Sequence, residues 1–279
     1  FDLVASQPAF IARPPDVTAS TFAHGGAFGD ELVMALFEAL PTYLAPGGRA
    51  LVLMESATRP GAPLHARVRK ALGDAPLDLL VLASKGNSPD AYSVGYASLL
   101  EPTFGARWRE VVVRYRAHLR AMGVEEFAYA LAVVTAPGDD DREGDARYTI
   151  TLPAQGLRGI DQEVLAGRQN ALALASRGDD ALLAATVRAT PGATYVEERP
   201  RPDPSLQPRW VVRFTRAAFA DRELTEPTWV LLGILDSAAT VADAVEGFAE
   251  ACGASPREVR SQVLGFVRES LARGLLVPA

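Results

Sequence analysis

The first ten residues constrain the fold most, because an apolar strand runs directly into a loop that carries chemically useful groups. Phe1–Ala5 has the apolar content of a short buried strand. The residues Ser6-Gln7-Pro8-Ala9-Phe10 follow at once, with a polar side chain, a proline and an aromatic ring close together. Proline is also common in plain turns after a strand. The segment is therefore either a site loop or an ordinary turn, and the residues that follow decide between the two.

The chain then alternates helical and strand patterns, which predicts an α/β fold. Apolar residues recur at helical spacing from Asp30 to Leu44, and Pro46-Gly47-Gly48 ends this helix. Asp30 is expected to cap the helix or to be a favourable acid in its first turn. A buried-strand pattern covers 49–54. Beyond it we expect a helix at 64–72, a strand at 78–83, helices at about 90–101 and 105–122, and a strand at 127–135.

The loop at 6–10 and the string LAPGGRALVLMES at 44–56 together resemble class I S-adenosylmethionine-dependent methyltransferases of the amino-methylating kind. In that family the loop commonly reads Asn/Asp/Ser-Pro-Pro-Tyr/Phe, and the later helix, turn and strand read Leu-x-Pro-Gly-Gly-x-hydrophobic. The resemblance covers about residues 1–135. It implies the C-terminal half of a Rossmann-like methyltransferase sheet, which ends in an antiparallel hairpin. The chain departs from the family at Ala9, where a second proline would stiffen the turn.

The resemblance implies methyl transfer from S-adenosylmethionine to a nitrogen of a small-molecule or peptide acceptor. Gln7 and the carbonyl of Pro8 would hold the N–H groups of the acceptor, and Phe10 would pack on its face. Positioning of this kind carries much of the rate when the cofactor supplies the reactive group. His24, in the glycine-containing loop that follows, is a candidate for orienting the substrate, or else a structural loop histidine.

The segment 86–122 lies where many such enzymes carry a substrate-binding cap. Arg109 and Arg116 would share one face of its second helix, together with Arg120. We therefore consider Arg109 and Arg116 as substrate-binding residues that could grip a phosphate or carboxylate. The alternative is a solvated helix surface.

The family pattern also implies a first half of the sheet, with a glycine-rich cofactor loop, upstream of Phe1. We therefore expect this chain to be an excerpt of a longer polypeptide or to pair with a second chain, and a homo-oligomer is also left open. Without that half, Leu3, Val52 and Val81 would lack their usual cover. The apolar sheet edge would then need a partner.

Composition and net charge bear on the type of acceptor, on membrane contact and on metal binding. The net charge of −6 disfavours RNA as the acceptor, although relatives of this fold methylate ribosomal RNA bases and that alternative stays open. No apolar run reaches the roughly 20 residues that span a bilayer, so we expect a cytoplasmic protein without membrane contact. Cys252 is the single cysteine and is expected in the core. With three scattered histidines, we expect no metal site.

We expect an α+β accessory region at 136–226, after an acidic loop at 137–145. Strands are predicted at 147–152, around a turn within 186–198, and at 210–214, with helices near 160–176 and 179–186.

The last region, 227–279, has stronger signals. Helices are predicted at 227–235 and 241–252, and Ser255-Pro256-Arg257-Glu258 opens a third with a full start signature. A short strand at 274–278 ends the chain. The order resembles a winged helix, or the small peptide-binding domain that recruits precursor peptides to modifying enzymes. A plain scaffold or dimerisation unit fits as well.

Three hypotheses remain at this point. The first is a methyltransferase with a C-terminal accessory domain. The second is a non-catalytic protein that keeps a methyltransferase-like shell, for which Ala9 is an argument. The third is a winged-helix interaction protein whose N-terminal half only resembles a methyltransferase.

Overall fold

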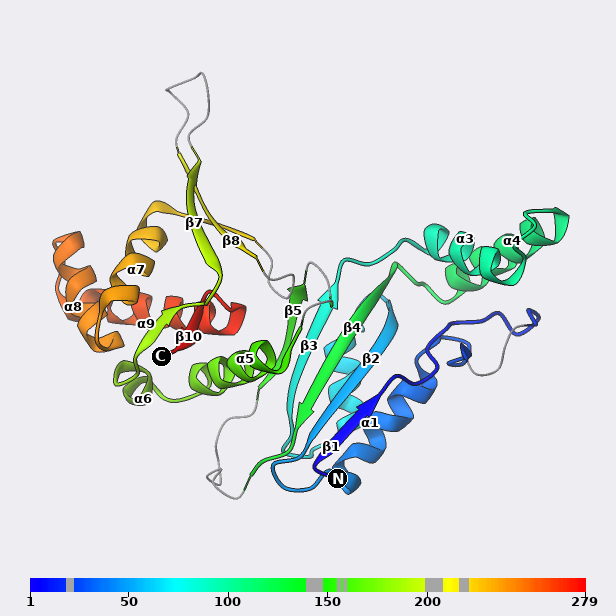
Figure 1. The fold of residues 1–279 in the computed structure, drawn as a ribbon, viewed down its shortest axis with the longest axis horizontal. Helices are drawn as coiled ribbons and strands as arrows, with labels where there is room; N and C mark the ends of the chain where they lie inside the picture. Colours follow the sequence, from blue (N-terminus) through cyan, green and yellow to red (C-terminus); the bar gives the residue numbers. More distant parts are fainter. Residues whose placement is uncertain (19–22, 139–147, 155–156, 158–159, 199–207, 216–220) are drawn as a thin grey trace. The chain divides into compact units, whose positions relative to one another are not determined.

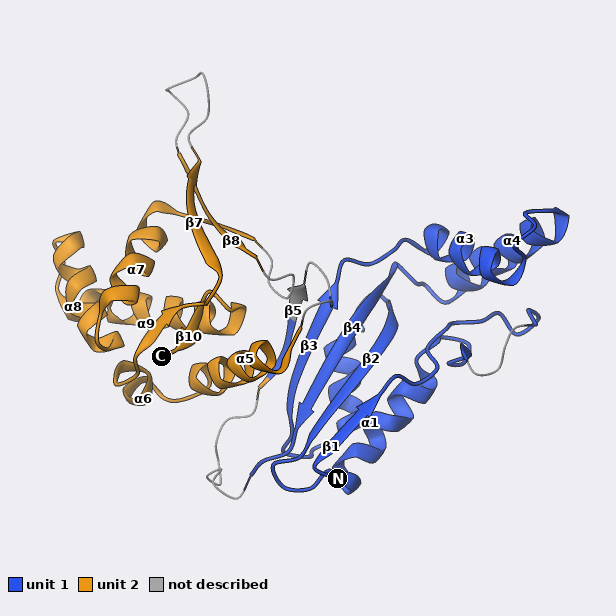
Figure 2. Ribbon diagram, viewed as in Figure 1, with its two compact units in different colours: residues 1–143, 149–157 blue, residues 144–148, 158–279 orange. Residues whose placement is uncertain are grey.

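The computed structural model describes residues 1–18, 23–138, 148–154, 157, 160–198, 208–215 and 221–279. The chain forms two compact units (Figure 2). Unit 1 comprises residues 1–143 and 149–157, and unit 2 comprises residues 144–148 and 158–279. Each unit is described by itself below.

Unit 1 is built on a mixed five-stranded sheet (Figure 1) with the strand order β1-β2-β4-β3-β5. Its strands are β1 (Leu3–Ser6), β2 (Arg49–Thr58), β3 (Asp78–Ser84), β4 (Glu126–Thr135) and β5 (Thr149–Ala154). The β1–β2 and β3–β5 pairs are parallel, whereas β4 is antiparallel to both of its neighbours, β2 and β3. The α/β class is therefore observed, and the mixed sheet is compatible with a Rossmann-like fold.

Two helices, α1 (Glu31–Tyr43) and α2 (Leu64–Leu72), cover one face of this sheet. Phe37 of α1 and Leu72 of α2 share a buried core with Val52 and Val81 of the strands. The expectation that Val52 and Val81 lack cover is therefore wrong, because these two helices bury them completely. Leu3, by contrast, is 60% exposed on the edge strand β1.

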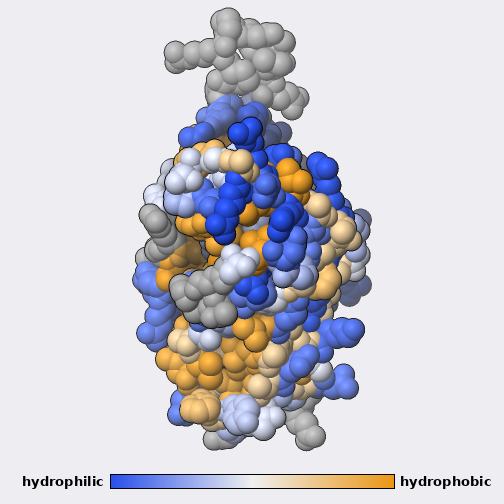
Figure 3. Space-filling model, turned by 90° about the vertical axis from the view of Figure 1, so that its right-hand side faces the viewer, coloured by the Kyte–Doolittle hydropathy of each residue, from blue (hydrophilic) through white to orange (hydrophobic). Residues whose placement is uncertain are grey.

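Apolar residues gather on the surface of unit 1 near β1 and α1. Figure 3 shows hydrophobic residues over the lower part of the view, at the level of these two elements. Phe1, Leu3, Leu32 and Tyr43 are exposed large apolar side chains of this region. A patch of this kind is typical of a surface that contacts another molecule.

The helical insertion between β3 and β4 is formed by α3 (Pro89–Leu100) and α4 (Ala106–Ala121), which pack on each other beyond one end of the sheet (Figure 1). Ser88 caps α3 by accepting a hydrogen bond from the Ala91 amide at 3.2 Å. The pair has its own aromatic core, in which the ring of Tyr92 lies against both Tyr115 and Phe127, the latter at the start of β4. The insertion is thus anchored to the end of the sheet at which β1 and β2 finish.

Unit 2 combines helices with two small antiparallel sheets. The helices are α5 (Gln162–Ala175), α6 (Asp179–Leu183), α7 (Glu226–Ser237), α8 (Val241–Cys252) and α9 (Pro256–Arg273). The strands β7 (Ala193–Glu198), β8 (Arg209–Phe214) and β9 (Arg222–Leu224) form one sheet, and β6 (Val187–Ala189) pairs with β10 (Leu276–Pro278) in the other. The helices expected within 227–279 are present, and both α8 and α9 begin with a capping box.

The boundaries between the two units differ from the domain boundaries expected after residues 135 and 226, because unit 1 also includes residues 149–157. The strand expected at 147–152 joins the sheet of unit 1 as β5, beside β3. The rest of the expected accessory region shares one core with 227–279, in which Leu182 and Val212 pack with Leu231 and Phe248. The final strand also pairs with β6, so residues 227–279 do not close a unit by themselves. Sequence periodicity could not reveal these pairings, because it reports local structure only.

Two further observations concern surface and membrane. Cys252, expected in the core, is exposed at the end of α8. No helix within the described ranges is long and apolar enough to cross a membrane.

Candidate functional site at the end of strands β1 and β2

The structure brings loops and strand ends together at one edge of the unit 1 sheet. β1 and β2 are parallel and run toward the same edge. β1 ends at Ser6, opposite Val52, and β2 continues to Thr58, where the antiparallel β4 begins with Glu126. Ligands of α/β proteins commonly bind outside the carboxyl ends of parallel strands. We call this region, made of residues 7–12, 24–30, 55–59 and 126–129, the carboxyl edge.

The three residues predicted as catalytic lie in the loop that follows β1 at this edge. Gln7 is exposed, and Pro8 and Phe10 are half-buried. The ring of Phe10 meets Tyr129 of β4 edge to face, with 6.1 Å between the ring centroids. Phe10 therefore has an aromatic neighbour that the sequence did not suggest, and the two rings form a wall at the carboxyl edge.

Two glycines, Gly25 and Gly29, allow another backbone segment to pack closely on this loop. Gly25 packs so closely that a Cβ added there would lie 2.6 Å from the Ala9 carbonyl oxygen and 2.7 Å from the Phe10 Cα. At Gly29, an added Cβ would lie 2.6 Å from the Phe10 carbonyl oxygen. The conformation of the loop at Ala9 is therefore restrained by backbone packing, although the second proline of the family pattern is missing.

His24 lies in the segment that packs on the loop, as part of a short parallel bridge with Ile11. The Ile11 amide donates to the Ala23 carbonyl at 3.0 Å, and the Gly25 amide donates to the Ile11 carbonyl at 3.1 Å. Burial, followed by the nearby charge of Arg13, lowers the pKa of His24 below its ordinary value. The neutral form of the His24 imidazole is thus favoured. His24 pairs with Ile11, the residue that follows Phe10.

A buried carboxyl group marks the centre of the carboxyl edge. Glu55 of β2 is only 3% exposed and lies opposite Tyr129 in the β2–β4 register. The hydroxyl of Tyr96, on α3, donates to Glu55 Oε2 at 2.8 Å. Burial raises the pKa of Glu55, and the hydrogen bond from Tyr96 offsets part of this rise. Perturbed carboxyl groups of this kind are enriched at functional sites.

A stack of tyrosines connects Glu55 to the insertion. The ring of Tyr92 stacks on Phe127 at 3.7 Å between centroids and lies 4.4 Å from the ring of Tyr96. The Tyr92 hydroxyl accepts a hydrogen bond from the buried Ala12 amide at 3.0 Å. Tyr129 stays 43% exposed. The carboxyl edge therefore presents one exposed ring backed by a fixed aromatic cluster and a buried carboxyl group.

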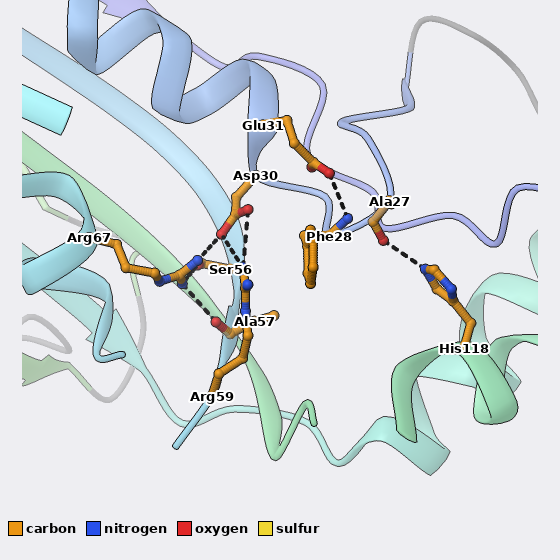
Figure 4. Close-up of polar contacts among 9 residues, drawn as sticks. All are labelled: Ala27, Phe28, Asp30, Glu31, Ser56, Ala57, Arg59, Arg67 and His118. Carbon is orange, nitrogen blue, oxygen red and sulfur yellow. Dashed lines mark hydrogen bonds and ion pairs between the residues drawn. The ribbon is translucent and has the colours of Figure 1, made fainter. Parts of the chain in front are cut away.

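An ionic network lies behind the loop (Figure 4). Asp30 is 4% exposed and forms ion pairs with Arg67 of α2 and with Arg59, which follows β2, the latter at 3.4 Å. Arg67 also donates to the Ser56 hydroxyl and to the Ala57 carbonyl, both at 2.7 Å. The network joins the start of α1 to α2 and to the end of β2.

Asp30 stands at the N-cap position of α1, one of the two places expected for it, but its side chain makes no capping hydrogen bond. It forms ion pairs with Arg59 and Arg67 instead, and hydrogen bonds between ionised groups are stronger than those between neutral groups. Glu31 accepts the Phe28 amide at 2.9 Å and so holds the turn before the helix.

Phe28 and Ala27 link this loop to other elements (Figure 4). The guanidinium of Arg59 stacks over the Phe28 ring at 4.1 Å from its centroid. His118 Nε2, on α4, lies 2.8 Å from the Ala27 carbonyl oxygen. The insertion therefore contacts the loop from the side opposite to the ionic network, and the loop is fixed between them.

Arg109 and Arg116, the two arginines predicted to bind substrate, have other surroundings than the residues described above. Arg116 pairs with Asp90 of α3 at 2.9 Å, and Arg109 is exposed on α4. Within the described part of the chain, neither makes a hydrogen bond or ion pair with the loop at 7–10. Arg116 acts as a link between α3 and α4.

Sequence reasoning missed Glu55, Tyr96 and Tyr129. Glu55 carries a readable signal, because it is a single acidic residue directly after the apolar run of β2. Tyr96 and Tyr129 are 33 residues apart in sequence. Tyr129 reaches Glu55 through the pairing of β2 with β4, and Tyr96 reaches it from α3. Among the residues that the structure describes, no cluster of three His, Cys, Asp or Glu side chains could hold a metal ion.

No protein-family model matches the chain, and no curated protein is significantly similar to it.

Proposed function

We propose that this chain supplies the acceptor side of an S-adenosylmethionine-dependent methyltransferase, which methylates a nitrogen of a small molecule or peptide. The observation that carries the proposal is the contact of Phe10 with Tyr129, which lies opposite the buried Glu55 in the β2–β4 register. Glu55 in turn accepts a hydrogen bond from Tyr96. Carboxyl, hydroxyl and aromatic groups therefore lie together near the ends of β1 and β2. This combination suits an amine or amide better than it suits a phosphate.

The sheet supports the same proposal. The resemblance implies a sheet that ends in an antiparallel hairpin, and β3 and β4 pair in this way at the expected place in the chain. The helical pair α3–α4 occupies the place expected for a substrate cap and contacts the loop through Ala27 and Ala12. These features rest on topology, and the activity itself is argued from the carboxyl edge.

The residues of this chain would orient the acceptor. The side-chain carbonyl of Gln7 and the Pro8 carbonyl would accept N–H groups, so that the nitrogen lone pair points away from them. Phe10 and Tyr129 would pack on the acceptor face. Glu55, whose pKa is raised, would accept a proton from the methylated nitrogen or bind its N–H. S-adenosylmethionine, when bound, would supply the methyl group on a cationic sulfur, and aromatic rings with a nearby carboxyl group fit a cation.

Methylation of RNA is less well supported. Three arginines of the insertion that could contact a backbone are paired with acids: Arg107 with Glu101, Arg114 with Asp16 and Arg116 with Asp90. Their charge is thus largely neutralised, and a phosphate backbone would have to displace these partners.

The test is calorimetric titration of S-adenosylmethionine and S-adenosylhomocysteine into the natural protein and into a Gln7→Ala, Phe10→Ala variant. We expect binding in the micromolar range for the natural protein, and methyl transfer to be lost in the variant while cofactor binding persists. Tyr43→Ala is the matched control, because Tyr43 is an exposed aromatic residue at the far end of α1. Absence of binding to either cofactor form would contradict the proposal.

A further inference from the structure

Unit 2 contains a cavity of about 290 Å³ between α5 and the β6–β10 strand pair. Val164 and Gly167 of α5 line one wall, and Arg188, Val277 and Pro278 of the strand pair line the other. This volume is at the lower end of the range of small-molecule sites, which begins at about 300 Å³. The cavity is remote in the chain from the residues of the carboxyl edge and has no part in the proposed methyl transfer.

A buried cation lines this cavity. Arg168 is only 2% exposed, and its Nη2 donates to the Ala272 carbonyl at the end of α9, at 3.1 Å. Burial lowers the pKa of Arg168 to about 10, so the guanidinium still carries its charge at neutral pH.

A second arginine stands on the opposite wall. Arg188 is exposed and lies opposite Val277 in the β6–β10 register. Because side chains alternate along a strand, Arg188 and Val277 face away from Val187 and Leu276, which pack into the core of unit 2. Among the described residues, the lining thus includes two arginine side chains, one on α5 and one on β6.

We propose that this cavity binds the carboxylate of a small ligand with an apolar body, with Arg168 and Arg188 as its anion-binding residues. A guanidinium presents two parallel N–H donors that match the two oxygens of a carboxylate. Val164, Val277 and Pro278 offer an apolar wall for the body of the ligand. The inference does not depend on the proposed methyl transfer.

The experiment is a titration of the full chain with sodium benzoate, followed through the amide NMR signals of Gly167 and Val277. Benzyl alcohol serves as the uncharged probe of equal shape, and inorganic phosphate as the competing anion. We expect saturable shifts with benzoate, and an affinity about tenfold lower in Arg188→Gln, because one charged hydrogen-bonding group is lost.

A second variant blocks the space without removing a charge. A Cβ added at Gly167 meets no atom within 4 Å, so Gly167→Leu can extend into the cavity. It should abolish binding of benzoate. The matched control is Gly265→Leu on α9, where an added Cβ likewise meets nothing within 4 Å and which does not line this cavity.

Several results would overturn the proposal. Equal binding of benzyl alcohol would mean a merely apolar cleft. Stronger binding of phosphate would assign the site to another class of anion. Unchanged affinity in Arg188→Gln or in Gly167→Leu, or no saturable binding of benzoate at its highest soluble concentration, would remove the site altogether.

Discussion

Substituting Gly25 by alanine tests how the loop after β1 is held. The added Cβ would lie 2.1 Å from the Gly29 carbonyl oxygen, 2.6 Å from that of Ala9 and 2.7 Å from the Phe10 Cα. All three atoms belong to the backbone, so no side chain can rotate to relieve the contact. Relief requires the backbone of the 24–30 segment to change around Gly29 and the segment to move away from the loop at 7–12, which would also withdraw Phe10 from Tyr129.

The expected magnitude follows from two opposing terms. Overpacking costs up to about 3 kcal/mol, and a contact this close against backbone belongs at that end. Alanine also restricts the unfolded chain, which stabilises the folded state by about 0.4–1 kcal/mol. We therefore expect Gly25→Ala to lower the free energy of unfolding by about 2 kcal/mol, as the difference of these terms.

The assay is urea unfolding followed by tyrosine and tryptophan fluorescence, with Gly95→Ala as the matched control. Gly95 lies within α3, where an added Cβ meets nothing within 4 Å. The same chemical change should there stabilise the protein by about 0.5–1 kcal/mol, because alanine is the better helix former. A Gly25→Ala protein as stable as the natural one would refute the packing argument.

Three further predictions concern the polar groups of the carboxyl edge. Arg67→Met should cost about 3 kcal/mol in urea unfolding, because the buried Asp30 loses its closest cation; a second substitution, Asp30→Asn, should recover part of this loss, and an unchanged midpoint would contradict it. The pKa of Glu55 is raised above its ordinary 4.5, so the folded state loses stability as pH rises from that value through the raised pKa. Glu55→Gln should remove this loss, so that the stability of the variant relative to the natural protein increases from acidic to neutral pH. The same pH dependence of stability in both proteins would disprove the assignment. Tyr92→Phe should cost about 1–3 kcal/mol, because the buried Ala12 amide loses its acceptor, and a loss below that range would mean that the amide finds another.

Local signals predicted much of the secondary structure. The helix expected at 64–72 is α2 with the same bounds, and the start signature at Ser255 opens α9 with a capping box. Such features depend on neighbours a few residues away, which the sequence displays directly. The strand expected at 49–54 instead runs to Thr58, because residues 55–58 pair with the start of β4.

The candidate site was predictable only in its local part. The Gln7–Phe10 loop was recognised because its residues are contiguous. Glu55 and Tyr96 are 41 residues apart, and Arg67 reaches Asp30 across 37 residues, so their contacts depend on the packing of separate elements. The same reason explains why β5 was assigned to the wrong region, since its pairing with β3 is not encoded in its own pattern.

A crystal structure grown with S-adenosylhomocysteine would show whether the carboxyl edge of β1 and β2 is a methyl-transfer site. We expect the ligand to lie at the carboxyl edge, with its sulfur facing Pro8 and Phe10. A ligand bound elsewhere, such as in the cavity beside Arg168, or no bound ligand at saturating concentration, would contradict it.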